Sequence, residues 1–168
     1  MTAEAVKNVL GLQPHPREGG WYVRTWESEE FVEASCFDDG RYDGARRTST
    51  AIYYLLEPGT FSEMHVLESD EIFHHYLGGA VEMLQLFEDG SSERVVIGKD
   101  LAAGERPQHV VKRRVWQGTR LLKAEGFALL GCTVSPGFEF GDYKDASAAE
   151  LVEKWPGEAE MIRELTNR

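Results

Sequence analysis

The sequence contains few cysteines, few basic residues and no long hydrophobic run. Its 168 residues include two cysteines, Cys36 and Cys132, which lie far apart and form no CxxC pair. We therefore expect two reduced thiols rather than a structural disulfide. No apolar run approaches the roughly eighteen residues that a membrane-spanning helix needs, and the first twenty residues lack the apolar core of a signal peptide. These absences predict a cytoplasmic protein that does not cross a membrane.

The shortage of basic residues also limits the possible partners. Eighteen Lys and Arg residues stand against 29 Asp and Glu residues, which gives a formal net charge of -11 at pH 7. Nucleic acids and anionic membrane surfaces bind to basic faces, so we expect neither as a partner. The sequence has no GxGxxG, P-loop or GxSxG motif, and so no signature of dinucleotide binding, triphosphate binding or serine hydrolase chemistry. Composition and motifs therefore argue against these partner and enzyme classes.

The middle of the chain is a series of short apolar segments separated by turn residues. Their β-branched and aromatic residues predict strands at residues 18–28, 48–56, 81–87, 93–97, 107–111, 115–118 and 127–134. Helical spacing occurs near the termini, where Thr2 and Ser147 can act as N-caps. Strands in the middle and helices at the ends predict one all-β domain with a closed or sandwiched architecture. Its expected parts are an N-terminal helix at about 2–11, a barrel at about 18–140 and C-terminal helices at about 147–166, within a single domain 1–168.

One stretch, GTFSEMHVLESDEIFHHYLGG, concentrates side chains with acid–base and metal-binding chemistry. In it Gly59 is followed after five residues by His65, and Glu71 is followed after six residues by Gly78. This spacing resembles the first motif of the cupin superfamily, whose domains are double-sheet jelly rolls. Leu67 stands where that motif has its second histidine. The resemblance implies a cupin double-stranded β-helix, that is, a jelly-roll barrel.

The chain as a whole resembles a narrower group, the cupins catalogued as DUF985 or cupin type 5. The matching segments are His15-Pro16, Glu18-Gly19-Gly20 and residues 49–56, 69–74, 131–138 and 151–156. Members of that group have been likened to nucleotide-sugar epimerases and to seed storage cupins. The resemblance therefore implies a small-molecule-binding protein and assigns no single reaction. His15, which lies beside two prolines, is interpreted as fixing a turn.

The same resemblance implies positions for a metal site. Cupin metal sites use two histidines and a glutamate from the first motif and one histidine from a second motif, and these positions hold His65, Leu67, Glu71 and Gln117 here. Imidazole and carboxylate ligands suit Mn, Fe, Ni or Zn, but two good ligands and one amide make a weak site. Side chains alternate along a strand, so His75 would share the face of Glu71. If a metal is bound, we expect His65, Glu71, His75 and Gln117 to hold it.

A metal-free site is the other interpretation of these residues, with His65 and Glu71 as the catalytic pair. An imidazole and a carboxylate can together remove and return a proton beside a carbonyl group. Burial would raise the pKa of Glu71 and suit it to this role. A tyrosine would serve as the acid on the far side, and three tyrosines remain open for that role: Tyr53, Tyr54 and Tyr143.

Ligand contacts are predicted from aromatic, amide and basic side chains, namely Tyr53, His75, Trp116, Gln117 and Arg47. Arginine pairs with carboxylate or phosphate through two parallel hydrogen bonds, so Arg47 indicates an anionic ligand. The basic run 112–114 is a second candidate for anion binding. The acidic, glycine-containing segment 29–47 is expected to be the most mobile part of the chain and a possible lid. An aromatic first strand with a free edge predicts a homodimer.

Three functions stay open at this stage. The first is an isomerase or epimerase-like enzyme that acts on a sugar-like or carboxylate substrate. The second is a metal-dependent cupin enzyme, either an oxygenase or an isomerase. The third is a non-catalytic binding protein for a small anionic ligand.

Overall fold

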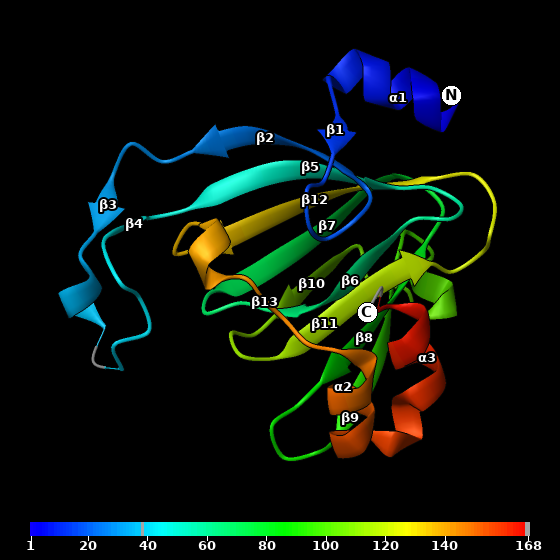
Figure 1. The fold of residues 1–168 in the computed structure, drawn as a ribbon. Helices are drawn as coiled ribbons and strands as arrows, with labels where there is room; N and C mark the ends of the chain where they lie inside the picture. The colour runs from blue at the N-terminus through cyan, green and yellow to red at the C-terminus, as the bar shows by residue number, and fades with distance from the viewer. Residues whose placement is uncertain (38, 167–168) are drawn as a thin grey trace.

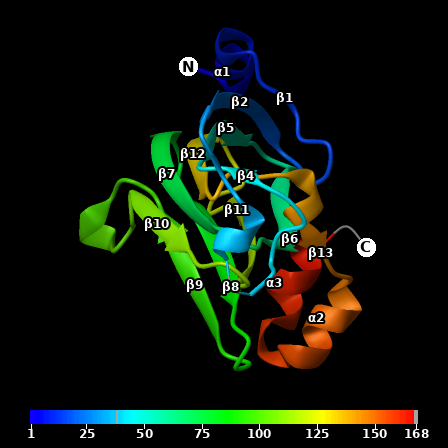
Figure 2. The ribbon, with the colours of Figure 1, turned by 90° about the vertical axis from the view of Figure 1, so that its left-hand side faces the viewer.

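Two antiparallel β-sheets packed face to face form the body of the protein (Figures 1 and 2). The computed structural model describes residues 1–37 and 39–166. The six-stranded sheet has the order β1-β2-β5-β12-β7-β10. Its strands are β1 (Gln13–Pro14), β2 (Trp21–Glu27), β5 (Thr50–Leu56), β12 (Ala128–Ser135), β7 (Asp70–Gly78) and β10 (Gln108–Val111).

The second sheet has five strands in the order β13-β6-β11-β8-β9. These are β13 (Lys144–Asp145), β6 (Phe61–Val66), β11 (Trp116–Leu121), β8 (Val81–Leu86) and β9 (Ser92–Ile97). Every predicted strand is present, and β11 runs further than predicted because residues 119–121 continue its pairing with β8. Strand β5, predicted to be central because it is apolar on both faces, lies between β2 and β12.

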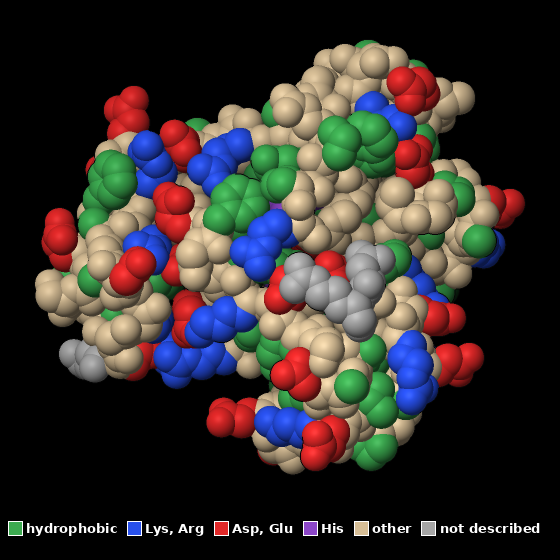
Figure 3. All heavy atoms as spheres, viewed as in Figure 1, with side chains coloured by type: hydrophobic (Ala, Val, Ile, Leu, Met, Phe, Trp, Pro, Cys, Tyr) green, Lys and Arg blue, Asp and Glu red, His purple; other side chains and the backbone are tan. Residues whose placement is uncertain are grey.

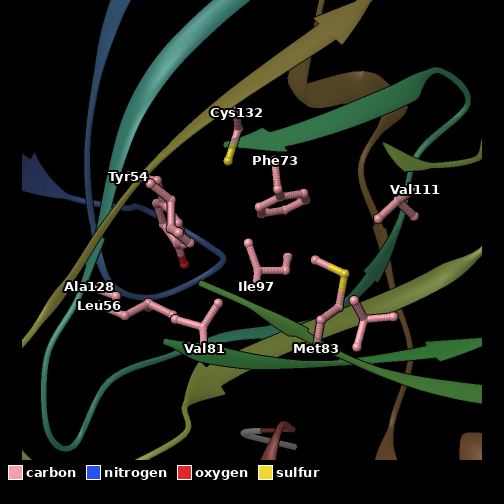
Figure 4. Packing of buried hydrophobic residues seen from close by; sticks show 11 residues of the cluster. Tyr54, Leu56, Phe73, Val81, Met83, Ile97, Val111, Ala128 and Cys132 are labelled. Carbon is pink, nitrogen blue, oxygen red and sulfur yellow. The ribbon is translucent and has the colours of Figure 1, made fainter. Parts of the chain in front are cut away.

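The core lies between the sheets and is filled by inward-facing side chains from both. Figure 4 shows Tyr54, Phe73 and Met83 converging there, with Cys132 above Phe73. All four are almost fully buried, so the barrel is a packed core over most of its length. At the end near β1 and β13, polar side chains line a cavity between the sheets, and this end carries the candidate site.

Short helices lie near both ends of the chain, as the sequence predicts. They are α1 (Ala3–Leu10), α2 (Ala148–Lys154) and α3 (Ala159–Glu164), with single 3-10 turns at Ala34–Cys36, Leu101–Ala103, Phe140–Asp142 and Pro156–Glu158. Thr2 caps α1, and the predicted capping box joins Ser147 to Glu150 at the start of α2. Helices α2 and α3 pack on the outer face of β6, β11 and β8 (Figure 1). Within residues 1–37 and 39–166, every helix is too short and too polar to span a membrane.

The segment predicted to be a mobile lid is tied to the barrel. It contains a small two-stranded sheet, β3 (Phe31–Val32) with β4 (Arg46–Arg47). The buried guanidinium of Arg46 makes two hydrogen bonds to Asp142, at 2.9 and 2.8 Å. Tyr42 is buried as well, and its hydroxyl lies 2.7 Å from Ser69 Oγ. These contacts fix the C-terminal part of the segment against the body of the protein.

Candidate functional site

A small polar cavity lies between the two sheets, and it brings together residues from distant parts of the chain. Water centres can occupy about 40 Å³ of it, and the whole recess with its mouth encloses about 470 Å³. A volume of about 40 Å³ for water centres gives the cavity room for a few waters or for one end of a small molecule. It is lined by His15, Glu18, Tyr22, Arg24, Thr50, Ile52, His65, Leu67, Glu71, Cys132, Val134, Phe138 and Phe140.

His65 enters the cavity from β6 with its ring held in one orientation. The Nδ1 atom lies 2.7 Å from the carbonyl oxygen of Glu63. The ring also stacks on Tyr143, with 5.0 Å between centroids and 15° between planes. A carbonyl oxygen can only accept, so Nδ1 carries a proton. In the neutral ring the lone pair is therefore on Nε2, which is the nitrogen left to meet a ligand.

Glu71 lies at the start of β7, lines the same cavity and is almost completely buried. Gln117 donates an amide hydrogen bond of 2.7 Å to Glu71 Oε2. Burial, followed by the negative charge of Glu18, raises the pKa of Glu71 from 4.5 to about 7. His65 and the hydrogen bonds from Gln117 and Cys132 oppose that rise. Glu71 is thus able to gain and lose a proton near neutral pH.

The N-terminal segment supplies two lining residues, His15 and Glu18, that the sequence interpretation did not place in the site. Glu18 accepts a hydrogen bond from Ser62 Oγ on β6. The segment can approach the sheets this closely because Gly19 has φ 91°, and a Cβ there would lie 2.4 Å from the carbonyl oxygen of Phe61. The sequence signal for this part of the site is the pair of glycines directly after Glu18. Side chains at those two positions would keep the N-terminal segment away from the sheets.

The mouth of the cavity carries one basic and two aromatic side chains. Arg24 of β2 contacts Glu27 Oε2 at 3.1 Å and the carbonyl oxygen of Phe138 at 3.4 Å. Phe138 packs edge-on against Phe140, with 5.1 Å between ring centroids. Arg24 is about one-third exposed, so its guanidinium can still meet a ligand from solvent. Arg24 also lines the cavity, whereas Arg47, the predicted anion contact, does not.

Three predicted ligand contacts lie elsewhere in the fold. Tyr53 lies on the outer face of the six-stranded sheet, next to α1 and Tyr76. Trp116 packs under the C-terminal helices, on the opposite face of β11 from Gln117. Arg47 donates a 2.6 Å hydrogen bond to the carbonyl oxygen of Ser28. None of the three lines the cavity.

His75 also lies away from the cavity, although it is on the same strand as Glu71. Four residues separate the two, which is roughly 13 Å along a strand. The Nε2 atom of His75 is 2.8 Å from the carbonyl oxygen of Gly79, at the far end of β7. The structure therefore does not bring His75 to His65 and Glu71.

The tyrosines proposed as acids also separate in the structure. The Tyr54 hydroxyl donates a 2.9 Å hydrogen bond to the carbonyl oxygen of Gly19, so it is committed to the backbone. Tyr143 stacks on His65, and its buried hydroxyl has no hydrogen-bond partner in the described part of the chain. Tyr22, which the sequence interpretation did not nominate, lines the cavity. Its ring lies edge-on to His15 at a centroid distance of 4.6 Å.

The donor set does not fit a cupin metal ion. Leu67 supplies no ligand, and Gln117 turns its amide nitrogen, a hydrogen-bond donor, toward Glu71. Gln117 Oε1 is buried without a hydrogen-bond partner among residues 1–37 and 39–166. The same residues contain no group of three or more His, Cys, Asp or Glu side chains placed to hold a metal. His65 and Glu71 are therefore the two remaining strong ligands of the implied set.

The basic run 112–114 is neutralised by acids of the neighbouring loops. Lys112 contacts Asp70 at 2.8 Å and Arg114 contacts Glu68 at 2.9 Å. Arg113 and Arg114 both pair with Asp39. Figure 3 shows the result over β3 and β4, where acidic and basic side chains interleave at the left of the view. This run ties the 29–47 segment to the barrel and leaves Arg24 as the basic group that lines the cavity.

Comparison with known proteins shows first the class of fold and then the family. The fold is that of the cupins: oxalate decarboxylase from Bacillus subtilis superposes with a TM-score of 0.55 at 14% identity, over 94% of this chain and 37% of that one. The family model described as Cupin superfamily (DUF985) matches residues 4–146. The chain therefore belongs to the DUF985 family of cupins, as the sequence resemblance predicted.

Solved structures match almost the whole chain, and a sequence relative matches about three quarters of it. A protein of Shewanella oneidensis has a TM-score of 0.88 at 31% identity, covering 99% of this chain and 98% of that one. A hypothetical protein from Leishmania major has a TM-score of 0.89 at 28% identity, covering 100% of both chains. An uncharacterized protein of Saccharomyces cerevisiae is 31% identical over 134 residues, which is 76% of this chain and 67% of that one.

Proposed function

We propose that this cupin is an isomerase or epimerase-like enzyme that moves a proton on a small anionic, sugar-like or carboxylate compound. The observation that carries the proposal is that His65 and Glu71 reach one enclosed cavity, where burial raises the pKa of Glu71 to about 7. A pKa near the working pH is what general acid–base catalysis requires. The two side chains also interact electrostatically, because a positive charge on His65 lowers the pKa of Glu71.

The roles of the two side chains follow from their hydrogen bonds. His65 presents the Nε2 lone pair, because Nδ1 is committed to the Glu63 carbonyl oxygen. It is therefore the base that takes a proton from carbon. Gln117 donates to one oxygen of Glu71 at 2.7 Å, and this bond orients the carboxyl group that would exchange a proton with a substrate hydroxyl. Both proton transfers then occur inside a site from which most water is excluded.

The shape of the recess supports a small substrate with a charged end. The cavity has room for only a few atoms, so only the reacting end of the substrate would enter it. The wider mouth carries Arg24 beside Phe138 and Phe140. An arginine there favours a carboxylate or phosphate group, and the aromatic rings favour a flat or sugar-like body.

Solvent-exchange NMR tests the proposal without a known product. Dihydroxyacetone phosphate, glyceraldehyde 3-phosphate and ribose 5-phosphate are incubated with the protein in D₂O, and loss of the proton signal beside the carbonyl is followed. We expect exchange with at least one of them, and a decrease of about 10²- to 10⁴-fold in the His65→Gln and Glu71→Gln variants. Ligand-dependent thermal stabilisation without exchange would support a non-catalytic binding protein instead.

We also propose that two copies of the chain associate through the sheet that carries β2. In the described residues the outer edge of β2 pairs only with the two residues of β1. Trp26 and Phe31 are more than half exposed beside this edge, and an unpaired strand edge favours pairing with a second chain. Light scattering should give twice the mass of one chain. A mass of one chain at micromolar concentration would contradict this arrangement.

A further inference from the structure

We propose that His15 completes the site as a neutral hydrogen-bond donor that faces the basic nitrogen of His65. This inference rests on the proposed function and adds a third catalytic residue to His65 and Glu71. The two imidazoles line the same cavity. Their surroundings fix them in opposite tautomers, so that one accepts a proton while the other donates a hydrogen bond.

The tautomer of His15 follows from its contacts with the backbone. Its Nδ1 atom accepts hydrogen bonds from the N–H groups of Glu18, at 2.8 Å, and Arg17, at 3.4 Å. An atom that accepts cannot carry the proton, so the neutral ring has its proton on Nε2. The ring is almost completely buried, and burial lowers the pKa of His15. His15 is therefore neutral at neutral pH, with an Nε2–H group at the cavity.

His65 has the opposite arrangement. Its Nδ1 donates to the carbonyl oxygen of Glu63 at 2.7 Å, and Nε2 carries the lone pair. The two rings are close enough to influence one another electrostatically. A substrate in the cavity thus meets a basic nitrogen from β6 and an N–H donor from the segment between β1 and β2.

Among residues 1–37 and 39–166, no side chain or backbone group accepts a hydrogen bond from Nε2 of His15. Its nearest acidic neighbour is Glu18, whose Oε2 is 3.8 Å from Nε2, beyond hydrogen-bond distance. The other oxygen of Glu18 accepts from Ser62, which holds the carboxylate beside the ring. The donor is therefore fixed in direction and free to bond a ligand oxygen.

These positions define a proton-transfer step on an α-hydroxy aldehyde, ketone or carboxylate. His65 Nε2 takes the proton from the carbon beside the carbonyl group. The electron pair of the C–H bond becomes the C=C bond of an enolate, and the carbonyl π pair moves onto oxygen. His15 Nε2–H stabilises that oxygen by a hydrogen bond, as neutral imidazole does in other isomerases. Return of the proton from His65 to the same carbon reforms the original carbonyl group. When the proton goes to the former carbonyl carbon instead, Glu71 takes the proton of the neighbouring hydroxyl group and delivers it to the enolate oxygen, so that the carbonyl forms at the adjacent carbon.

The first test is the tautomer of each ring, read from long-range ¹⁵N–¹H NMR spectra of the whole protein at pH 7.5. We expect the Nε2–H form for His15 and the Nδ1–H form for His65. The same tautomer in both rings, or a charged imidazolium at His15, would overturn the inference. This result does not depend on finding a substrate, so it separates the inference from the proposed function.

The second test uses two substitutions that divide the two roles of the His15 ring. In His15→Asn the amide oxygen can replace Nδ1 as backbone acceptor, but no donor occupies the Nε2 position. In His15→Gln the amide can reach the Nε2 position as a donor, but the backbone acceptor is lost. Loss of one oxyanion donor costs about 10²- to 10³-fold in rate, so we expect that decrease for His15→Asn in the D₂O exchange assay, with an unchanged melting temperature. His15→Gln should keep more exchange activity despite a lower melting temperature.

The reverse order of the two variants would show that His15 serves only to fix its turn. The matched control is His74→Asn, because His74 lies on the outer face of the sheet with Thr133 as its partner at 3.4 Å. This variant should exchange at the wild-type rate. If wild-type protein exchanges none of the three phosphates, the proposed function fails, while the tautomer spectra still decide the inference.

Discussion

Replacing Glu71 by Gln should stabilise the protein at pH 8 and leave its stability nearly unchanged at pH 5. Burial raises the pKa of Glu71 from 4.5 in the unfolded chain to about 7 in the folded one. Between these values the folded state binds more protons than the unfolded state, so the stability contribution of this group is complete below pH 4.5 and is lost as the pH rises to 7. The difference corresponds to about 3 kcal/mol.

The magnitude applies with little screening by solvent, because Glu71 is only 7% exposed. Glutamine removes the buried charge and can still accept the hydrogen bond from Gln117. The gain at pH 8 should therefore approach about 3 kcal/mol, which for a chain of this size is a rise of roughly 6–12 °C in melting temperature.

The assay is urea unfolding of wild type and Glu71→Gln at pH 5, 6, 7 and 8. Other groups titrate in this range, and the histidines His15, His74 and His109, whose pKa values burial lowers, act in the opposite direction. The difference between the two proteins cancels these contributions. A difference that stays constant from pH 5 to pH 8 would refute the account of Glu71.

Two further substitutions test how the site is held in place. Gly19→Ala should lower stability by more than about 1 kcal/mol and reduce ligand binding, because its Cβ would lie 2.4 Å from the carbonyl oxygen of Phe61. Gly90→Ala is the control, since Gly90 has a similar φ of 89° but open space around it; equal losses in the two variants would contradict the role of close approach. Arg46→Ala should destabilise the fold by about 3–5 kcal/mol, because it leaves Asp142 buried without its cation. A loss below about 1 kcal/mol in urea unfolding would show that this ion pair does not anchor the segment.

Much of the fold could be predicted from the sequence because its strands carry strong local signals. The alternation of residues, the turn residues and the two capping motifs depend on neighbours in the chain, and the structure confirms them. The segment 29–47 was different. Its polar composition indicated a loop, but the burial of Arg46 against Asp142 depends on a contact between residues 96 positions apart. No local pattern in the segment predicts that contact.

The sequence predicted only some of the residues that line the candidate site. The predicted residues that lie elsewhere in the fold show why. Trp116 and Gln117 are adjacent on β11, so they point to opposite faces and cannot both line one cavity. His75 shares a face with Glu71, yet four residues along a strand place it too far away. His15 required knowledge of how the N-terminal segment folds back over the barrel. Alternation along a strand therefore restricts the candidates, and the distance along the strand restricts them further.

The residues at the positions that resemble a metal site explain why the pKa of Glu71 is raised rather than lowered. Leu67 removes one ligand, and Gln117 replaces another with an amide that donates to Glu71. A metal ion would stabilise the carboxylate charge and hold its pKa low. Here the carboxylate faces burial and the charge of Glu18, and its pKa rises to about 7. The barrel positions that can hold a cation elsewhere in the fold class thus carry, in this protein, a buried carboxyl group whose pKa lies near neutral pH.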